Sequence, residues 1–200
     1  HISTLDDENI TSQLLNNNVG YISLNRFVDN EKTIIATQNI FQSFVNTKAI
    51  IIDLRFSGGG DASAVTDLLA YFISEEDINI SFPELIKTKE LKNVSHKDNI
   101  SISYIEKPLF VLTSVKTISA GEAFAYYLQK KERATIIGEN TAGAGYRVDA
   151  FKLPYNFFFV NSIFTTFDIN KGEGWQGDGI KPDISTLGSE ALDIALSKIK

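Results

Sequence analysis

The sequence predicts an α/β fold, in which buried strands alternate with amphipathic helices. Two continuous apolar runs, residues 49–54 (AIIIDL) and 109–113 (LFVLT), have the length and composition of strands that are buried on both faces. Each run is followed by a turn and then by a segment whose apolar residues recur with helical spacing. Strand–helix–strand alternation of this kind is typical of a sheet flanked by helices.

The first half of the chain adds three elements to this pattern. Residues 5–15 are polar with scattered Leu and Ile, which is typical of a weak helix or a lead-in. Residues 19–24 (VGYISL) indicate a strand, and residues 33–45 place their apolar side chains near one helical face. We therefore expect a lead-in over residues 1–18 and one domain over residues 19–200.

The second half begins with a polar stretch that contains strand-like pieces at residues 78–82 and 100–105. Beyond it the pattern predicts a helix, a strand, an aromatic strand or hairpin, and a final helix, over residues 119–130, 134–137, 157–167 and 191–199. Aromatic residues that alternate along a strand usually belong to a core, so we expect the aromatic segment to be buried.

Composition excludes several classes of function. The net charge of −6 and the lack of any Lys/Arg run argue against nucleic-acid binding. No apolar run approaches the roughly 18 residues of a membrane span, and the start has no signal-peptide pattern. The absence of cysteine excludes disulfides, zinc–thiolate sites and thiol catalysis. Because the chain does not begin with Met, we expect a processed product or part of a longer protein.

A first glycine-rich motif, DLRFSGGG, follows the buried strand at residues 49–54. Open α/β sheets bind ligands at this end of their strands, and Gly58, Gly59 and Gly60 let backbone N–H groups approach a ligand. A phosphate cradle is one interpretation, but neither G-x-G-x-x-G nor GK[ST] is present. An oxyanion hole and a plain strand-to-helix turn are the other two interpretations.

The second motif, TISAGEAFAYYL, places Ser119 immediately before a helix. Unpaired N–H groups at a helix start create a positive field that stabilises an alkoxide or an oxyanion, and the Ala120 N–H is one possible donor. The same residues form an S-x-x-E capping box with Glu122, which needs no catalysis. Two further loops are rich in glycine: GENTAGAGY at residues 138–146, and GWQGDGIKPDI around the only tryptophan, Trp175.

Together, the order and spacing of these motifs resemble the C-terminal-processing (tail-specific) serine peptidases. That family includes the tricorn core and the repeats of interphotoreceptor retinoid-binding protein, and the resemblance runs from about Val19 to Ile184. The stretches SAGEAFAYYLQ and RATIIGENTAG look most similar to the tricorn and retinoid-binding branch. The resemblance implies a ClpP/crotonase-like fold with mixed sheets flanked by helices.

The resemblance also implies a site for acyl transfer without a cofactor or metal. Ser119 would be the nucleophile, and the oxyanion hole would comprise the N–H of Ala120 and a glycine N–H of the Gly59–Gly60 pair. Residues beside the substrate would be Gly58, Gly143 and Tyr146. The implied substrate is a peptide or an unfolded protein, and the implied location is the periplasm or cell envelope.

The general base departs from the family pattern. The C-terminal-processing branch has a lysine where this chain has Ala144. The tricorn branch has a histidine and a glutamate, whose matching positions here are Ser23 and Gln176. Other basic groups are Lys116, three residues before Ser119, and two histidines: His1, which could be a tag remnant, and His96, which reads as a surface residue.

Three hypotheses follow for the function. The first is a serine endopeptidase whose base lies on another segment or subunit, or is an uncommon one. The second is a catalytically impaired domain that binds peptides or another apolar ligand. The third, a crotonase-like acyl-CoA enzyme, rests on fold analogy alone.

Overall fold

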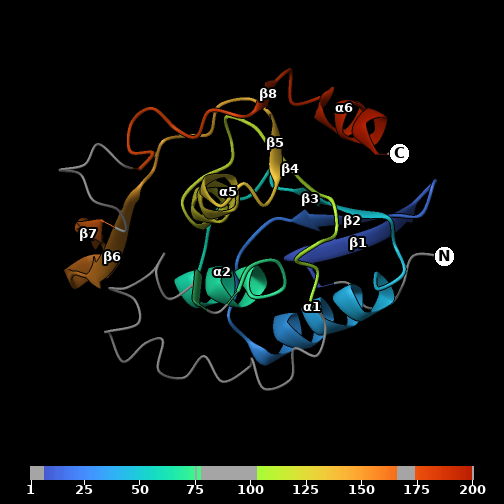
Figure 1. Cartoon of the computed structure of the whole chain (residues 1–200). Helices are drawn as coiled ribbons and strands as arrows, with labels where there is room; N and C mark the ends of the chain where they lie inside the picture. Colours follow the sequence, from blue (N-terminus) through green and yellow to red (C-terminus); the bar gives the residue numbers. More distant parts are fainter. Residues whose placement is uncertain (1–6, 75, 78–102, 166–173, 200) are drawn as a thin grey trace.

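The computed structural model describes residues 7–74, 76–77, 103–165 and 174–199. The strand-like piece at residues 78–82 and half of the one at 100–105 lie outside the described residues, as do both histidines. The expected α/β architecture is confirmed: a mostly parallel sheet is flanked by helices on both faces (Figure 1).

The main sheet contains six strands in the order β1-β2-β3-β4-β5-β8. The first two strands pair antiparallel and all the other pairs are parallel. The carboxyl ends of the parallel strands therefore meet at one edge, where the loops that carry the sequence motifs begin. The strands span Ile10–Leu15, Val19–Leu24, Ala49–Asp53, Leu109–Thr113, Thr135–Gly138 and Ile184–Ser185.

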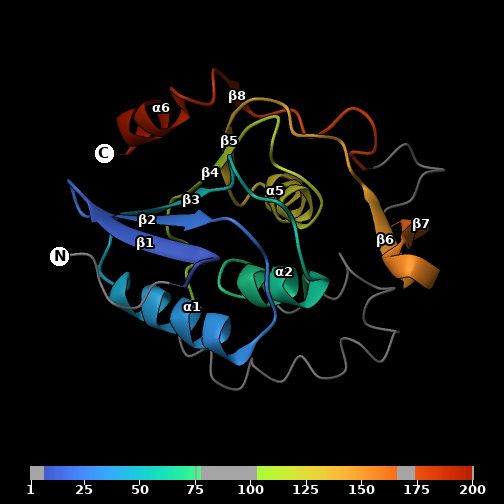
Figure 2. The same cartoon turned by 180° about the vertical axis from the view of Figure 1, so that it is seen from behind.

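Helices cover the two faces of this sheet unequally. Among the described residues, three helices pack against one face and the final helix packs against the other. The front and back views show both layers (Figures 1 and 2). The larger layer contains α1 (Glu31–Ser43), α2 (Ala62–Leu69) and α5 (Ala120–Lys130), and the smaller layer contains α6 (Ala191–Lys198).

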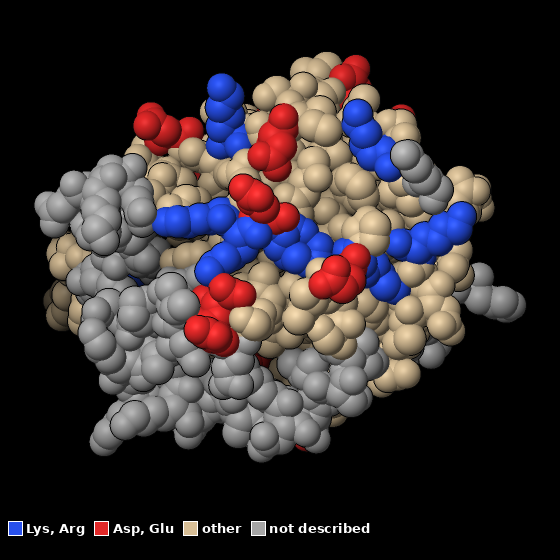
Figure 3. Space-filling view, viewed as in Figure 1, with Lys and Arg blue, Asp and Glu red and all other residues tan. Residues whose placement is uncertain are grey.

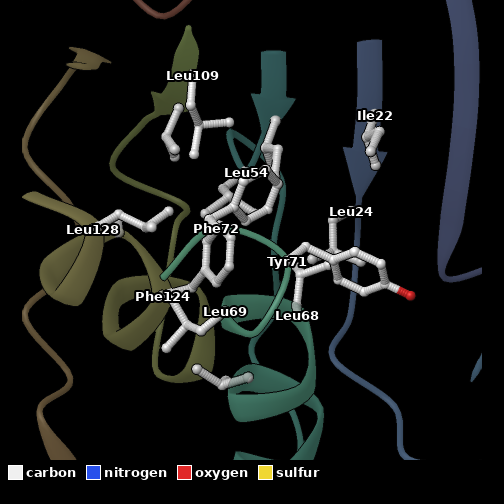
Figure 4. Packing of buried hydrophobic residues seen from close by; sticks show 14 of the residues in the cluster. Ile22, Leu24, Leu54, Leu68, Leu69, Tyr71, Phe72, Leu109, Phe124 and Leu128 are labelled. Carbon is white, nitrogen blue, oxygen red and sulfur yellow. The ribbon is translucent and has the colours of Figure 1, made fainter. Parts of the chain in front are cut away.

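Residues of the central strand β3 alternate between the two resulting cores. Ile50 and Ile52 face the three-helix side, whereas Ala49 and Ile51 face α6, and all four are buried. This arrangement explains why residues 49–54 read as a continuous apolar run rather than an alternating one. The larger core continues into an aromatic and aliphatic cluster between the sheet, α2 and α5 (Figure 4).

Two expectations from the sequence were wrong. Residues 10–15 form the edge strand β1 rather than a weak helix or lead-in, because Ile10 is buried in the larger core and the strand pairs with β2 along its whole length. The aromatic segment supplies β7 (Phe158–Thr165), which pairs with β6 (Tyr146–Lys152) in a hairpin, and its described side chains, at residues 157–162, are exposed rather than buried.

The surface seen in Figure 3 mixes both signs of charge. Lysine and arginine side chains form a band across its middle, and acidic side chains lie on both sides of that band. Among the described residues, no helix combines the length and the apolar character needed to cross a bilayer.

Three core tyrosines make the fold sensitive to alkaline pH. Burial raises the pKa values of Tyr21, Tyr71 and Tyr104 to about 12 from an ordinary value of 10.0. Between these values the unfolded chain loses phenolic protons that the folded chain retains, so the free energy of unfolding should fall as pH rises from 10 through 12. Chemical denaturation at a series of pH values measures this loss.

A pair of variants isolates the phenolic contribution. Tyr71→Phe keeps the ring that stacks 4.1 Å from Phe41 and should flatten the alkaline part of the profile. Tyr155→Phe should follow the parent profile, because the Tyr155 side chain is 93% exposed and meets solvent in both states. A Tyr71→Phe profile as steep as the parent's would contradict the prediction.

Candidate active site

Two loops that are distant in the sequence are joined by hydrogen bonds at the carboxyl edge of the sheet. The Thr117 hydroxyl donates to the Leu54 carbonyl at 2.8 Å, and the Ile118 N–H donates to the Ser57 carbonyl at 3.1 Å. The Ser114 hydroxyl donates to the backbone carbonyl of Arg55, in the same loop as Leu54 and Ser57, at 2.5 Å. These bonds place the first two sequence motifs side by side.

A salt bridge between Asp53 and Arg55 holds the first loop in place. The buried Asp53 carboxylate accepts two side-chain N–H groups of Arg55 and the Tyr21 hydroxyl, and the shortest of these contacts measure 2.6 and 2.5 Å. The hydrogen bonds to Asp53 raise the pKa of the Arg55 guanidinium above its ordinary value. The same guanidinium donates to the Gly188 carbonyl at 2.6 Å, so the clamp also secures the turn before α6.

Ser119 is the N-cap of α5 and has a strained backbone, with φ at 56° and ψ at −115°. An ordinary N-cap residue is extended, and a non-glycine residue with positive φ costs about 1–3 kcal/mol. Such strain concentrates at functional sites, where it aims one side chain. The side chain of Ser119 is exposed, at the start of a helix whose N–H groups face outward.

Glu122 is the residue that holds this strained turn. Its carboxylate is completely buried and accepts the Ser119 N–H at 2.9 Å, which is the Glu122 half of the predicted capping box. It also accepts the Thr141 hydroxyl at 2.6 Å and the N–H groups of Gly143 and Ala144 at 2.6 and 2.8 Å. One carboxylate therefore joins the turn at Ser119 to the third sequence motif.

The glycine pair lies directly against Ser119. A β-carbon added to Gly59 would meet the Ser119 β-carbon at 2.9 Å, and one added to Gly60 would meet the Phe27 carbonyl oxygen at 1.9 Å. Both glycines have positive φ, at 83° and 140°. The Phe27 N–H donates to the Gly59 carbonyl, and the Phe27 carbonyl accepts the Asp61 N–H. The N–H of Gly60 therefore takes no part in this pairing.

A cavity of about 400 Å³ opens beside Ser119. Among the described residues its lining includes one arginine and two aspartates but no lysine or histidine. Arg147, Asp61 and Asp149 are the charged members. The others are small, apolar or aromatic: Gly60, Ala62, Val65, Ser119, Ala120, Ala123, Ala144, Gly145, Tyr146, Val148 and Trp175. The described residues contain no cluster of acidic or histidine side chains that could hold a metal ion.

The three positions expected for the helpers of Ser119 have separate fates. Ala144 lines the cavity, with its N–H held by Glu122. Gln176 lies beside the same loop, where its side-chain oxygen accepts the Gly145 N–H at 2.8 Å. Ser23 lies in β2 opposite Asp53 and is not among the residues that line the cavity.

The other basic candidate points elsewhere. The Lys116 ammonium lies 5.0 Å from the centre of the Phe56 ring, in a cation–π contact. Lys116 is also absent from the described lining of the cavity.

The predicted substrate-binding residues are only partly brought together. Tyr146 lines the cavity. Gly58 instead donates its N–H to the Asn25 carbonyl, and Gly143 packs against the backbone of Gly177. Sequence reasoning missed Arg147 and Asp149, which also line the cavity. The available signal was the position of Arg147 and Asp149. They alternate with Tyr146 and Val148 at the start of the strand that follows the third motif.

The buried carboxylate predicts a large effect of a small change. In Glu122→Gln an amide nitrogen replaces one oxygen and faces N–H donors, so the free energy of unfolding should fall by about 3 kcal/mol. Glu31→Gln removes the same charge from an exposed position in the first turn of α1 and should change stability by less than about 0.5 kcal/mol. Urea denaturation compares them, and equal stability of the two variants would refute the role given to Glu122.

Comparisons of this sequence with a family model and with known proteins point to the same peptidase family. Residues 18–186 match peptidase family S41. A carboxyl-terminal-processing protease of Picosynechococcus sp. is 32% identical over 138 residues, which are 68% of this chain and 31% of that protein. A carboxy-terminal-processing protease of Bartonella bacilliformis is 32% identical over 177 residues, 83% of this chain and 38% of that protein. The chain therefore spans about a third of the length of these relatives.

Solved structures show the same fold at lower identity. The photosystem II D1 C-terminal processing protease superposes with a TM-score of 0.63 and 21% identity, over 90% of this chain and 49% of that one. The tricorn protease superposes with a TM-score of 0.56 and 17% identity, over 92% of this chain and 16% of that one. The order of motifs, the fold and the sequence match agree, and this chain belongs to peptidase family S41.

Proposed function

We propose that this domain hydrolyses peptide bonds through an acyl-enzyme on Ser119. The observation that carries the proposal is the exposed Ser119, on a strained helix start, in one cavity with Ala120 and Gly60. A nucleophile, two backbone N–H groups and an adjacent hollow are the parts that acyl transfer requires.

The proposed reaction has two steps. The Ser119 hydroxyl loses its proton to a base while its oxygen attacks the peptide carbonyl, and the N–H groups of Ala120 and Gly60 stabilise the resulting oxyanion. Collapse of this intermediate breaks the C–N bond, and the amine leaves with a proton. Water then attacks the ester, releases the acid and returns the proton to Ser119.

The described lining of the cavity has neither lysine nor histidine, so the base of this proposal is a group outside that lining or an uncommon base within it. A second candidate function rests on the same observation: a peptidase-like domain that binds peptides without cleaving them. Peptides or unfolded proteins are the proposed ligands in both cases. The resemblance to tail-specific peptidases supports a location in the periplasm or cell envelope.

A fluorophosphonate probe separates the two functions, because it reacts with an activated serine. We expect the probe to label the parent protein and to leave Ser119→Ala unlabelled. Ser197→Ala, which changes a serine at the far end of α6, should be labelled like the parent. A folded parent protein that takes up no label would overturn the peptidase proposal and leave peptide binding.

The loop beside Ser119 permits a gain-of-function test. Ala144→Lys introduces an amine into the cavity at the position where the C-terminal-processing branch has its base. If Ser119 lacks an efficient base, labelling by the probe should accelerate by about 100-fold. The variant Ala144→Met has a similar length but no amine and should label like the parent.

An unchanged rate in Ala144→Lys would have one of two meanings, which the parent rate distinguishes. Fast labelling of the parent would show that a base is already supplied from elsewhere. Slow labelling of both proteins would show that the hydroxyl of Ser119 is not placed for attack.

A further inference from the structure

The hairpin of β6 and β7 carries apolar side chains that nothing in the described structure covers. Tyr155 at its turn is 93% exposed, and Phe157 and Phe158 beside it are 68% and 61% exposed. Both front and back views show the hairpin apart from the main sheet, beyond α5 (Figures 1 and 2). Within the described residues, its sheet consists of β6 and β7.

Both faces of the hairpin carry exposed apolar side chains. One face carries Val148, Phe158 and Val160, and the other carries Phe151 and Phe159, whose ring centres lie 6.5 Å apart. An isolated two-stranded hairpin is only marginally stable in water, and exposed apolar patches of this kind mark sites of interaction. The hairpin is therefore a surface suited to an apolar partner.

The start of β6 connects this surface to Ser119. Tyr146, Arg147, Val148 and Asp149 line the cavity beside Ser119, and the exposed side chains continue along the same strand to the turn. A chain seated in the cavity thus meets one end of β6 and has the exposed apolar side chains of the hairpin ahead of it. An extended peptide that runs along a strand presents alternate side chains to such a surface.

We propose that the hairpin extends the substrate site and binds an extended, apolar polypeptide segment that flanks the bond at Ser119. This inference rests on the proposed function for the position of the substrate. The seven residues of β6 reach about 23 Å, so the flanking segment needs about seven residues to contact the turn. The preferred substrate class is an unfolded chain rich in Val, Leu and aromatic residues.

Peptide binding tests the proposal without chemistry. Fluorescence anisotropy measures fluorescein-labelled peptides on the Ser119→Ala background: a short peptide, a long peptide with apolar flanks, and a long peptide with Ser and Gln flanks. The long apolar peptide should bind with a Kd about tenfold lower than the other two. Because no bond is cleaved, a negative probe experiment at Ser119 leaves this measurement valid.

Two hairpin variants, Phe158→Ser and Phe159→Ser, each alter one face. At least one should remove the advantage of the long apolar peptide and leave binding of the short peptide unchanged. Leu14→Ser is the control, because Leu14 is 59% exposed in β1 of the main sheet and should keep that advantage.

Two results would overturn the proposal. One is an equal Kd for all three peptides on the Ser119→Ala protein whose hairpin is unchanged. The other is a parent dimer, in sedimentation, that Phe158→Ser or Phe159→Ser converts to a monomer while peptide binding is unchanged. That outcome would assign the hairpin to contact with a second copy of the chain.

Discussion

The buried carboxylate of Glu122 is the constraint on which the rest of the site depends. Removing a carboxylate from water costs several kcal/mol unless donors replace the lost hydration. Here four donors do so, and they come from the turn at Ser119 and from residues 141–144. Moving either segment takes at least one donor away from a buried charge. The geometry around Ser119 is therefore coupled to that of the third motif, although 22 residues separate Glu122 from Ala144.

This coupling explains how the strain at Ser119 is maintained. A positive φ at serine costs about 1–3 kcal/mol, and a charge-assisted hydrogen bond is worth a similar amount. The bond from the Ser119 N–H to Glu122 therefore offsets that cost. The same carboxylate lies in the first turn of α5, where the helix dipole favours a negative charge. The same four donors disperse the charge of this carboxylate.

The sequence was sufficient for the fold and for the position of Ser119, and insufficient for the contacts around them. The apolar run at residues 49–54 is continuous because helices pack on both faces, so it identified the central strand. Glu122 was visible only as one half of a capping box, because its partner Thr141 is brought near by the sheet rather than by sequence spacing. β1 was missed for the same reason: its pairing with β2 and the burial of Ile10 are tertiary effects.

The loop of the third motif is held in place through its backbone. The loop at Ala144 is held by Glu122 on one side and by Gln176 on the other, and neither bond uses the Ala144 side chain. Its conformation is therefore independent of whether that side chain is a methyl group or an amine. Because this loop leads directly into β6, the same two bonds set the direction in which the hairpin leaves the cavity. The frame that positions Ser119 thus also determines where a bound chain would meet the exposed apolar strand.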